Sequence, residues 1–361
     1  MCTLHYYALY NNAGGKVHHL SRRQVRGGVI LKHSWRAFLV LTVVMIALML
    51  AITTYWAGMG YFQMDRKEVV ETHPWDKDLE LEVINDMGDV KVYSWDESKI
   101  EIKGTKKTLF GAEELDKIDL HVEKQDTFRI TTKRDKDSPW VWMDLTVYIP
   151  AEMTVKRIEV NFGILRLEGA EGNISLTNRA GRILVYDSEN LTRVRSNAGD
   201  VRIKNVQRIE SLESDVGDIE ITQVEFVGDV RSDAGDIKLT NIGHIDYVRA
   251  DAGNVKCENC GIISRVDAEA GDIDLDLMEL DENGLDVRNS AGDIKVSFPV
   301  NSSFDFELYT DAGDLRITGF YEDNVTFRYP RDKEKRGQVN EGGPLVRLET
   351  DSGDITLEGK G

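Results

Sequence analysis

A Gly-Asp pair recurs along this chain at a fixed interval. Seven successive glycines, the first Gly163 and the last Gly271, stand 18 residues apart, and the interval then lengthens to 21 residues at Gly292 and Gly313. A final copy, Ser352-Gly353-Asp354, follows 40 residues later, which corresponds to two coils of about 20 residues. A fixed period of this length is typical of folds in which each repeat stacks on the next. The repeat therefore predicts a stacked architecture over residues 158–361.

Apolar and small residues recur at set distances from each glycine. Around Gly199 they are Val194, Ser196, Ala198, Val201, Ile203, Val206, Ile209 and Leu212. Spacings of two indicate a strand with one buried face, and spacings of three indicate a strand that turns a corner while still pointing inward. A chain of antiparallel hairpins with Gly-Asp at each tip is the alternative, but equal periods suit stacking better. We therefore expect an all-β parallel β-helix, or solenoid, of about ten coils of 18–21 residues.

The residue before the glycine is usually alanine. These alanines are Ala198, Ala234, Ala252, Ala270, Ala291 and Ala312. In a stacked fold their side chains would form one column, and we expect that column to line a part of the interior too narrow for larger side chains. Glycine allows the backbone angles of a tight bend, and the Asp after it can bond the local backbone.

The N-terminal part of the chain differs in charge from the rest. Residues 1–64 contain no Asp or Glu, so all 63 acidic residues follow them. Residues 37–59 carry no charge, and a helix of this length, at about 1.5 Å per residue, spans the ~30 Å apolar core of a bilayer. Because basic residues precede this segment, we expect the N-terminus in the cytoplasm and the repeat region outside. A cleaved signal peptide is the alternative.

These features divide the chain into five predicted segments. They are a basic cytoplasmic tail (1–36), a transmembrane helix (37–59), a stalk (60–78), a β-rich cap region (79–157) and the Gly-Asp repeat solenoid (158–361).

Acidic residues form the first candidate site. An Asp follows most of the glycines, and in a stack these side chains would stand about 4.8 Å apart: Asp200, Asp218, Asp236, Asp272, Asp293 and Asp314. Repulsion at that spacing could be relieved by a bound Ca²⁺ or by basic residues such as Arg202 and Lys238, three positions after their glycines. The repeat lacks the Gly-Gly-x-Gly-x-Asp motif of Ca²⁺-binding repeats. We therefore expect these residues to build the turn, keep a Ca²⁺ column as the alternative, and expect no other cofactor.

Cys257-Glu258-Asn259-Cys260 and Trp140-Val141-Trp142 are the remaining candidate motifs. Both cysteines occupy inward positions of the repeat, and no second Cys or His pair completes a zinc site. We expect them to be small buried hydrophobic residues, with a disulfide in an oxidising exterior as the alternative. Alternation places the two indoles on one face, where we expect them in the core of the cap; a sugar-stacking platform is the alternative.

Signals of catalysis and of nucleic-acid binding are weak. The histidines of the acidic part, His73, His121 and His244, are far apart, and the chain has no Gly-x-Ser-x-Gly, His-Glu-x-x-His or phosphate-loop motif. Acidic pairs are abundant, but they belong to the repeat and predict no unique catalytic site. A net charge of −18 argues against binding to nucleic acid. We therefore do not expect an enzyme or a nucleic-acid partner.

The repeat motif also resembles a known family. The copies Ala198-Gly199-Asp200-Val201-Arg202-Ile203 and Ser352-Gly353-Asp354-Ile355-Thr356-Leu357 resemble the bacterial "putative adhesin" family of Ser/Ala-Gly-Asp-Ile β-strand repeats. Residues 85–95 and the Val147-Tyr148-Ile149-Pro150 step resemble that family's leading segment, so the resemblance covers about residues 80–361. It implies a β-helical surface domain without a known catalytic residue set. Some similar single-span members are associated with envelope-stress systems of Gram-positive bacteria.

These observations together predict a function in binding. We expect a bacterial single-pass membrane protein whose extracellular solenoid is a non-enzymatic, adhesin-like surface or envelope interaction module, with cell-wall polymer or an envelope protein as its partner. One alternative is an accessory protein of an envelope-stress sensing system that acts through a membrane partner. A carbohydrate-active enzyme is the least favoured.

Overall fold

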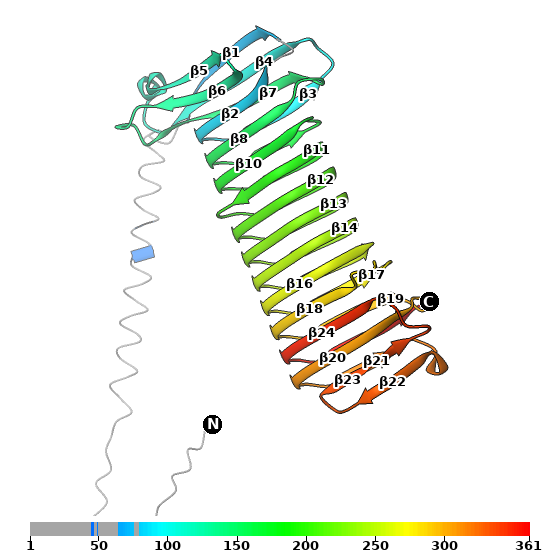
Figure 1. The fold of residues 1–361 in the computed structure, drawn as a ribbon. Coiled ribbons are helices and arrows are strands. Elements are labelled where there is room, and N and C mark those ends of the chain that lie inside the picture. Colours follow the sequence, from blue (N-terminus) through cyan, green and yellow to red (C-terminus); the bar gives the residue numbers. More distant parts are fainter. Residues whose placement is uncertain (1–44, 47–48, 50–63, 76–78) are drawn as a thin grey trace, which may run out of the picture. The chain divides into compact units, whose positions relative to one another are not determined.

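The computed structural model describes residues 45–46, 49, 64–75 and 79–361 (Figure 1). The chain separates into two compact units, residues 1–62 and 63–361. The predicted tail lies outside the described residues, and so does the predicted span 37–59, except for Met45, Ile46 and Met49, which are helical. Within the described ranges, no helix is long and apolar enough to cross a membrane.

The second unit is built around a stack of parallel coils (Figure 1). Strands β11 (Ile183–Ser196), β12 (Val201–Val216), β13 (Ile219–Ala234) and β14 (Ile237–Ala252) pair in order, each parallel to the next. Each pairing joins a residue to the one 18 positions later, as in the alignment of Ile183 with Val201. The 18-residue period is therefore one turn of a solenoid, as predicted, and the alternative chain of antiparallel hairpins is wrong.

Shorter strands extend this stack in both directions. In the neighbouring coils each turn is divided into two strands, which pair with the corresponding strands of the next turn. These strands are β8 (Val155–Phe162), β9 (Leu165–Glu168), β10 (Asn173–Ala180), β15 (Val255–Cys260), β16 (Ile262–Ala270), β17 (Ile273–Leu277), β18 (Leu285–Ala291) and β19 (Ile294–Pro299).

The spacing of apolar residues is explained by a second corner in each coil. The inward positions predicted around Gly199 from Val201 to Leu212 are buried, with spacings of two and then three. Where the spacing changes, a non-glycine residue adopts a left-handed backbone conformation with φ between 51° and 57°: Asp187, Asn205, Gln223, Asn241 and Asn259. Asn and Asp tolerate this conformation better than most residues. The left-handed residue turns the strand so that Val206, like Ile203, still points inward.

The alanine column lies outside the coil, contrary to the expectation from sequence. Ala198, Ala252 and Ala270 are exposed, and Val216 in the same column is 56% exposed. The narrow buried column lies two residues earlier and consists of Ser196, Ser214, Ser232, Ala250 and Ala268. The bend therefore begins before the glycine and interrupts the strand alternation, so that the residue preceding glycine points outward.

Four strands of the cap region cover the first coil, which consists of β2 (Glu80–Met87) and β3 (Val90–Trp95). This coil is paired with β8 and β9 on one side and with β6 (Thr127–Arg134) and β7 (Val141–Pro150) on the other. β6 and β7 pair antiparallel with β5 and β4, respectively. The elements that complete the predicted cap region are β4 (Lys99–Thr108), the 3-10 helix η1 (Ala112–Lys117) and β5 (Ile118–Lys124).

The first described strand belongs to this cap. β1 (Asp65–Pro74) lies within the predicted stalk, yet it pairs antiparallel with β4 over its whole length, from Asp65 opposite Thr108 to Pro74 opposite Lys99. Residues 65–74 are thus part of the sheet instead of a stalk.

The last strands of the chain do not follow sequence order. β24 (Leu345–Ser352) and β25 (Ile355–Lys360) pair on one side with β18 and β19, and on the other with β20 (Phe304–Ala312) and β21 (Leu315–Thr318). The coil of Gly353 therefore lies between those of Gly292 and Gly313, and the expectation of two further coils in sequence order is wrong.

The residues before β24 close the end of the stack. β22 (Val325–Pro330), which follows the short 3-10 helix η2 (Glu322–Asn324), and β23 (Glu334–Val339) form an antiparallel hairpin. β23 also pairs antiparallel with β20. The hairpin thus covers an edge that would otherwise expose unpaired backbone groups.

Candidate functional site

Several Gly-Asp turns are held from inside the coil by a side chain three positions before a glycine. The Ser196 hydroxyl donates to the carbonyl oxygen of Gly199 at 3.0 Å. Where the stack leaves sequence order, the Thr350 hydroxyl donates to the carbonyl of Gly292 at 3.2 Å. These side chains are buried, and a buried carbonyl needs such a partner. The repeated serines and threonines before the glycines were the sequence signal for this contact, which the sequence reasoning missed.

The predicted Asp column forms a ladder on the outside of the same turns. The backbone N–H of each Asp donates to the Oδ1 atom of the Asp in the preceding coil, at 3.3 Å for Asp218 to Asp200 and 3.0 Å for Asp236 to Asp218. Asn254 continues the ladder between Asp236 and Asp272, and the N–H of Asp293 donates to Asp272 at 3.0 Å. The structure therefore brings the predicted residues together as turn-building groups.

At the C-terminal end the ladder follows the spatial order of the coils. The N–H of Asp354 donates to Asp293, and the N–H of Asp314 donates to Asp354, both at 2.8 Å. Arg316 also bonds Asp354 at 2.8 Å and Asp314 at 2.9 Å. The bond from the Asp314 backbone, together with Arg316, holds the pKa of the Asp354 carboxyl below its usual range. The Asp354 carboxylate is thus stabilised in the charged form by a backbone donor and a side-chain donor.

The Ca²⁺ alternative for this column finds no ligand cluster. Among residues 64–75 and 79–361, no group of three or more His, Cys, Asp or Glu side chains is placed to hold a metal ion. The basic residues three positions after the glycines have carboxylate partners: Lys256 lies 2.7 Å and Lys238 3.6 Å from Glu258. The Ca²⁺ column stays a prediction.

A second polar column follows the left-handed corners. The side-chain amide of Asn259 donates to Oδ1 of Asn241 at 2.6 Å, and that of Asn205 donates to Asp187 at 2.5 Å. A groove of about 900 Å³ runs beside these corners and is lined by Glu171, Glu189, Gln207 and Glu225, among others. The recurrence of Asn at intervals of 18 residues could have revealed this column.

A further outward surface consists of two adjacent columns, which we call the charged strip. One column holds Asp229, Tyr247, Arg265, Asp286, Arg347 and Glu307, and the other holds Arg231, Arg249, Asp267, Arg288, Glu349 and Tyr309. Each member lies directly opposite the next in the parallel ladder. Although the chain carries 63 acidic and 45 basic residues, the strip has five of each.

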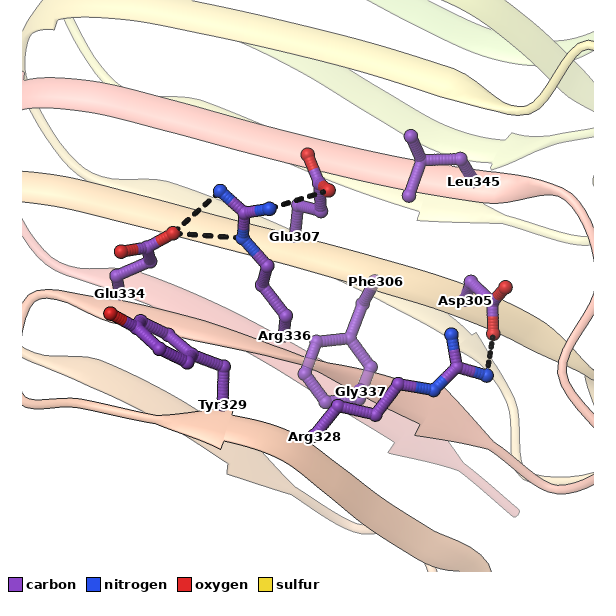
Figure 2. A pocket seen from close by; sticks show the side chains of 9 residues that line it. All are labelled: Asp305, Phe306, Glu307, Arg328, Tyr329, Glu334, Arg336, Gly337 and Leu345. Atoms are coloured by element: carbon purple, nitrogen blue, oxygen red, sulfur yellow. Dashed lines mark hydrogen bonds and ion pairs between the residues drawn. The ribbon is translucent and has the colours of Figure 1, made fainter.

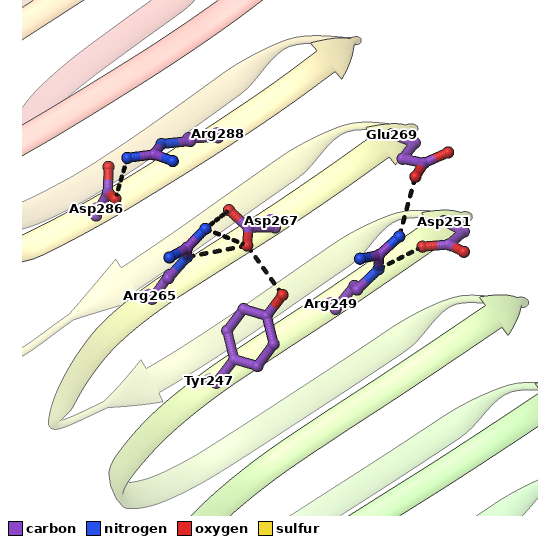
Figure 3. A network of polar contacts seen from close by, with 8 residues as sticks. All are labelled: Tyr247, Arg249, Asp251, Arg265, Asp267, Glu269, Asp286 and Arg288. Atoms are coloured by element: carbon purple, nitrogen blue, oxygen red, sulfur yellow. Dashed lines mark hydrogen bonds and ion pairs between the residues drawn. The ribbon is translucent and has the colours of Figure 1, made fainter.

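Ion pairs within coils and a hydrogen bond between coils connect residues of the strip (Figure 3). Arg265 lies 2.8 Å from Asp267, Arg288 lies 2.8 Å from Asp286, and the Tyr247 hydroxyl donates to Asp267 at 2.9 Å. Partial burial, and then the bond to Asp267, raises the pKa of Tyr247, so its proton remains available for donation. Exposed pairs of this kind contribute little to stability. A ligand group can therefore replace one partner at small cost.

The strip ends in a hollow beneath the C-terminal hairpin (Figure 2). The hollow has a volume of about 520 Å³ and is lined by Phe306, Tyr329 and charged side chains. Arg336 lies between Glu334, at 2.6 Å, and Glu307, at 3.5 Å. Arg347 of the strip also lies 2.8 Å from Glu307. Because Glu307 belongs to both features, the strip and the hollow form one continuous polar surface.

The Trp motif faces away from the core, which corrects the preferred interpretation. Val141 is fully buried, so alternation turns Trp140 and Trp142 outward. Trp140 is 59% exposed, and its ring packs on that of Phe110 at 5.3 Å between centroids. The interior of the cap is filled by other residues, among them Met143 and Phe128.

The cysteine motif forms a disulfide between Cys257 and Cys260, both of which are buried. The bond spans the left-handed corner at Asn259. The predicted burial of both cysteines is confirmed. The structure also contains the disulfide that was the alternative prediction.

The model of the Toastrack DUF4097 family matches residues 53–358. No curated protein matches the chain.

Several solved structures are similar over most of the chain. A "putative adhesin" from Bacteroides fragilis is 12% identical, with 81% of this chain and 97% of that chain covered and a TM-score of 0.31. A "putative adhesin" from Parabacteroides merdae is 10% identical, with coverage of 81% and 96% and a TM-score of 0.27. A "putative cell adhesion protein" from Clostridium sporogenes is 10% identical, with coverage of 82% and 100% and a TM-score of 0.19.

Proposed function

The chain belongs to the Toastrack DUF4097 family, and from this premise we propose that it is a non-enzymatic surface or envelope interaction module. Its solenoid presents the charged strip and the adjoining hollow to a repetitive partner such as a cell-wall polymer, or to an envelope protein. The family match supports the proposal because it covers most of the chain, from before β1 into β25.

The observation that carries the proposal is the register of the charged strip. Arginine and carboxylate side chains recur at the spacing of successive coils, about 4.8 Å, and roughly half of each arginine side chain is exposed. Arginine presents a planar fork of donors to carboxylate or phosphate groups. A polymer that contacts several coils at once gains affinity by multivalency although each contact is weak. The geometry therefore suits an extended ligand better than a small substrate.

The location of the module is the finer part of the proposal. The apolar segment 37–59 would anchor the chain once in a bacterial cell membrane, with the basic tail in the cytoplasm and the solenoid outside. The disulfide between Cys257 and Cys260 supports an extracytoplasmic location, because disulfides persist in oxidising compartments.

A binding assay with purified cell-wall sacculi tests the function. The full chain in nanodiscs is sedimented with sacculi, with and without Ca²⁺. We expect saturable binding that is weakened at least threefold by the double change Arg265→Gln and Arg288→Gln in the charged strip. The matched control changes Arg202→Gln and Lys238→Gln, two exposed cations outside the strip that also have carboxylate partners.

The outcomes separate the candidate functions. Equal binding by the strip variant and the control would place the contact elsewhere on the solenoid. Failure of the wild-type chain to bind sacculi would favour the envelope-stress alternative, in which a membrane protein is the partner.

A further inference from the structure

Three exposed apolar side chains gather at one end of the N-terminal cap. β4 lies between β1 and β7, and Thr108 at its end is opposite both Asp65, the first residue of β1, and Val141, the first residue of β7. Met64 precedes Asp65, Phe110 is two residues after Thr108, and Trp140 precedes Val141. Their exposed fractions are 37%, 55% and 59%, respectively. We call these three residues the apolar rim.

The side chains of the apolar rim are not needed to complete the core of the cap. Phe110 and Trp140 contact each other, with ring planes tilted by 42°, but each leaves more than half of its surface to solvent. The core beneath them is already closed by buried residues such as Val141 and Met143. Single exposed apolar residues are common, whereas several gathered at one place indicate a contact surface.

Chain connectivity indicates what covers the rim. Only residues 60–64 separate the predicted span from Asp65, and six residue steps cover at most about 20 Å. Trp and other amphipathic aromatic side chains prefer the lipid–water interface. The nearby lysines have acidic partners, Lys67 with Asp116 and Lys107 with Asp144. Arg66 donates to the sulfur of the rim residue Met64 at 3.5 Å.

We propose that the apolar rim contacts the lipid interface of the membrane that holds the predicted span. This inference rests on the anchoring part of the proposed function and adds a second point of attachment. Two attachments, the span and the rim, would restrict the tilt of the solenoid relative to the membrane.

Site-specific photocrosslinking tests the contact in the full chain. Phe110 is replaced by p-benzoyl-phenylalanine, and the protein is reconstituted in phosphatidylcholine nanodiscs and irradiated. Phe162 and Phe327 are matched controls, because they are 54% and 44% exposed and lie outside the rim. We expect a lipid adduct from position 110 at least fivefold above that from position 327. Position 140 gives an independent second probe.

Membrane extraction at alkaline pH distinguishes a failure of the rim contact from a failure of the membrane anchor. If the chain resists extraction but positions 110 and 140 give no more lipid adduct than position 327, the rim contact is overturned and the anchor stands. Adducts of position 110 with protein or glycan in place of lipid also overturn it. If the chain is extracted as a peripheral protein, the anchoring proposal fails and the rim proposal fails with it.

Discussion

The backbone N–H of Asn254 donates to Oδ1 of Asp236 at 2.8 Å, and the side-chain amide of Asn254 donates to the same oxygen at 3.2 Å. Asn254 itself replaces the Asp found at this position in the neighbouring coils, and its Oδ1 accepts the N–H of Asp272 at 2.9 Å. The ladder thus needs an oxygen acceptor at each step and does not need a negative charge at each step.

Substitutions at Asp236 should show whether the ladder needs a hydrogen-bond acceptor or a negative charge at this position. Asp236→Asn keeps Oδ1 as an acceptor and should change the free energy of unfolding little, whereas Asp236→Ala should lower it by about 1 kcal/mol through loss of the hydrogen bond. Urea unfolding of both variants measures the difference. If the column instead binds Ca²⁺, Asn would be as damaging as Ala, and only the wild-type chain would be stabilised by added Ca²⁺.

Glycine at the turn should be indispensable. Gly235 has φ +133°, and a Cβ at this position would lie 2.3 Å from the carbonyl oxygen of Gly217. Gly235→Ala should cost about 1–3 kcal/mol for the backbone conformation alone, with a further loss from the clash. Ala234→Ser, at the adjacent half-exposed position, is the matched control and should be nearly neutral. Similar thermal stabilities for the two variants would contradict this account of the turn.

Stability should depend on the charge of Asp354 in acid. Because the folded-state pKa of this carboxyl is depressed by the N–H of Asp314 and by Arg316, its contribution is present above its ordinary pKa of 3.8 and is lost as the pH falls through the folded-state value. The difference in unfolding free energy between wild type and Asp354→Asn should therefore shrink as the pH is lowered below about 4. A difference that stays constant between pH 6 and pH 2.5 would show that the depressed pKa has no effect on stability.

The coil formed by β24 and β25 should be essential for attaching β20 and β21 to the stack. β20 and β21 pair with the body of the solenoid through β24 and β25. Truncation after Val339 should therefore abolish hydrogen-exchange protection in β20 to β23 and leave that of β11 to β14 intact, as expected when each repeat contacts only its neighbours. Deletion of Gly361 alone is the control. Retained protection of β20 in the truncated chain would mean that it can pair directly with β18.

Local patterns in the sequence accounted for the individual coil. The spacing of Val201, Ile203 and Val206 predicted their burial, and the invariant glycine predicted a bend. The same reasoning misplaced Ala198 because strand alternation was continued through a bend that begins before the glycine. It also placed Trp140 and Trp142 in the core, since alternation shows that two residues share a face but not which face is buried.

The candidate surface could be predicted only in part. The Asp column was visible because an Asp follows the glycine in most repeats. The charged strip was not, because its columns change residue type from coil to coil, from Tyr247 to Arg265 to Asp286. The continuity of the strip with the C-terminal hollow depends on Arg347 lying between Asp286 and Glu307, although Arg347 comes 61 and 40 residues after them in the sequence.

The sequence by itself determined the all-β class, the 18-residue coil and the positions of its turn, because glycine conformation and side-chain alternation are local properties. Only the tertiary structure decided the order in which coils are stacked. Successive coils have nearly the same cross-section, so one coil can pair with many others at similar energy. Placement of the Gly353 coil between those of Gly292 and Gly313 depends on the hairpin that closes the open edge at β20, a requirement that exists only once the whole stack has formed.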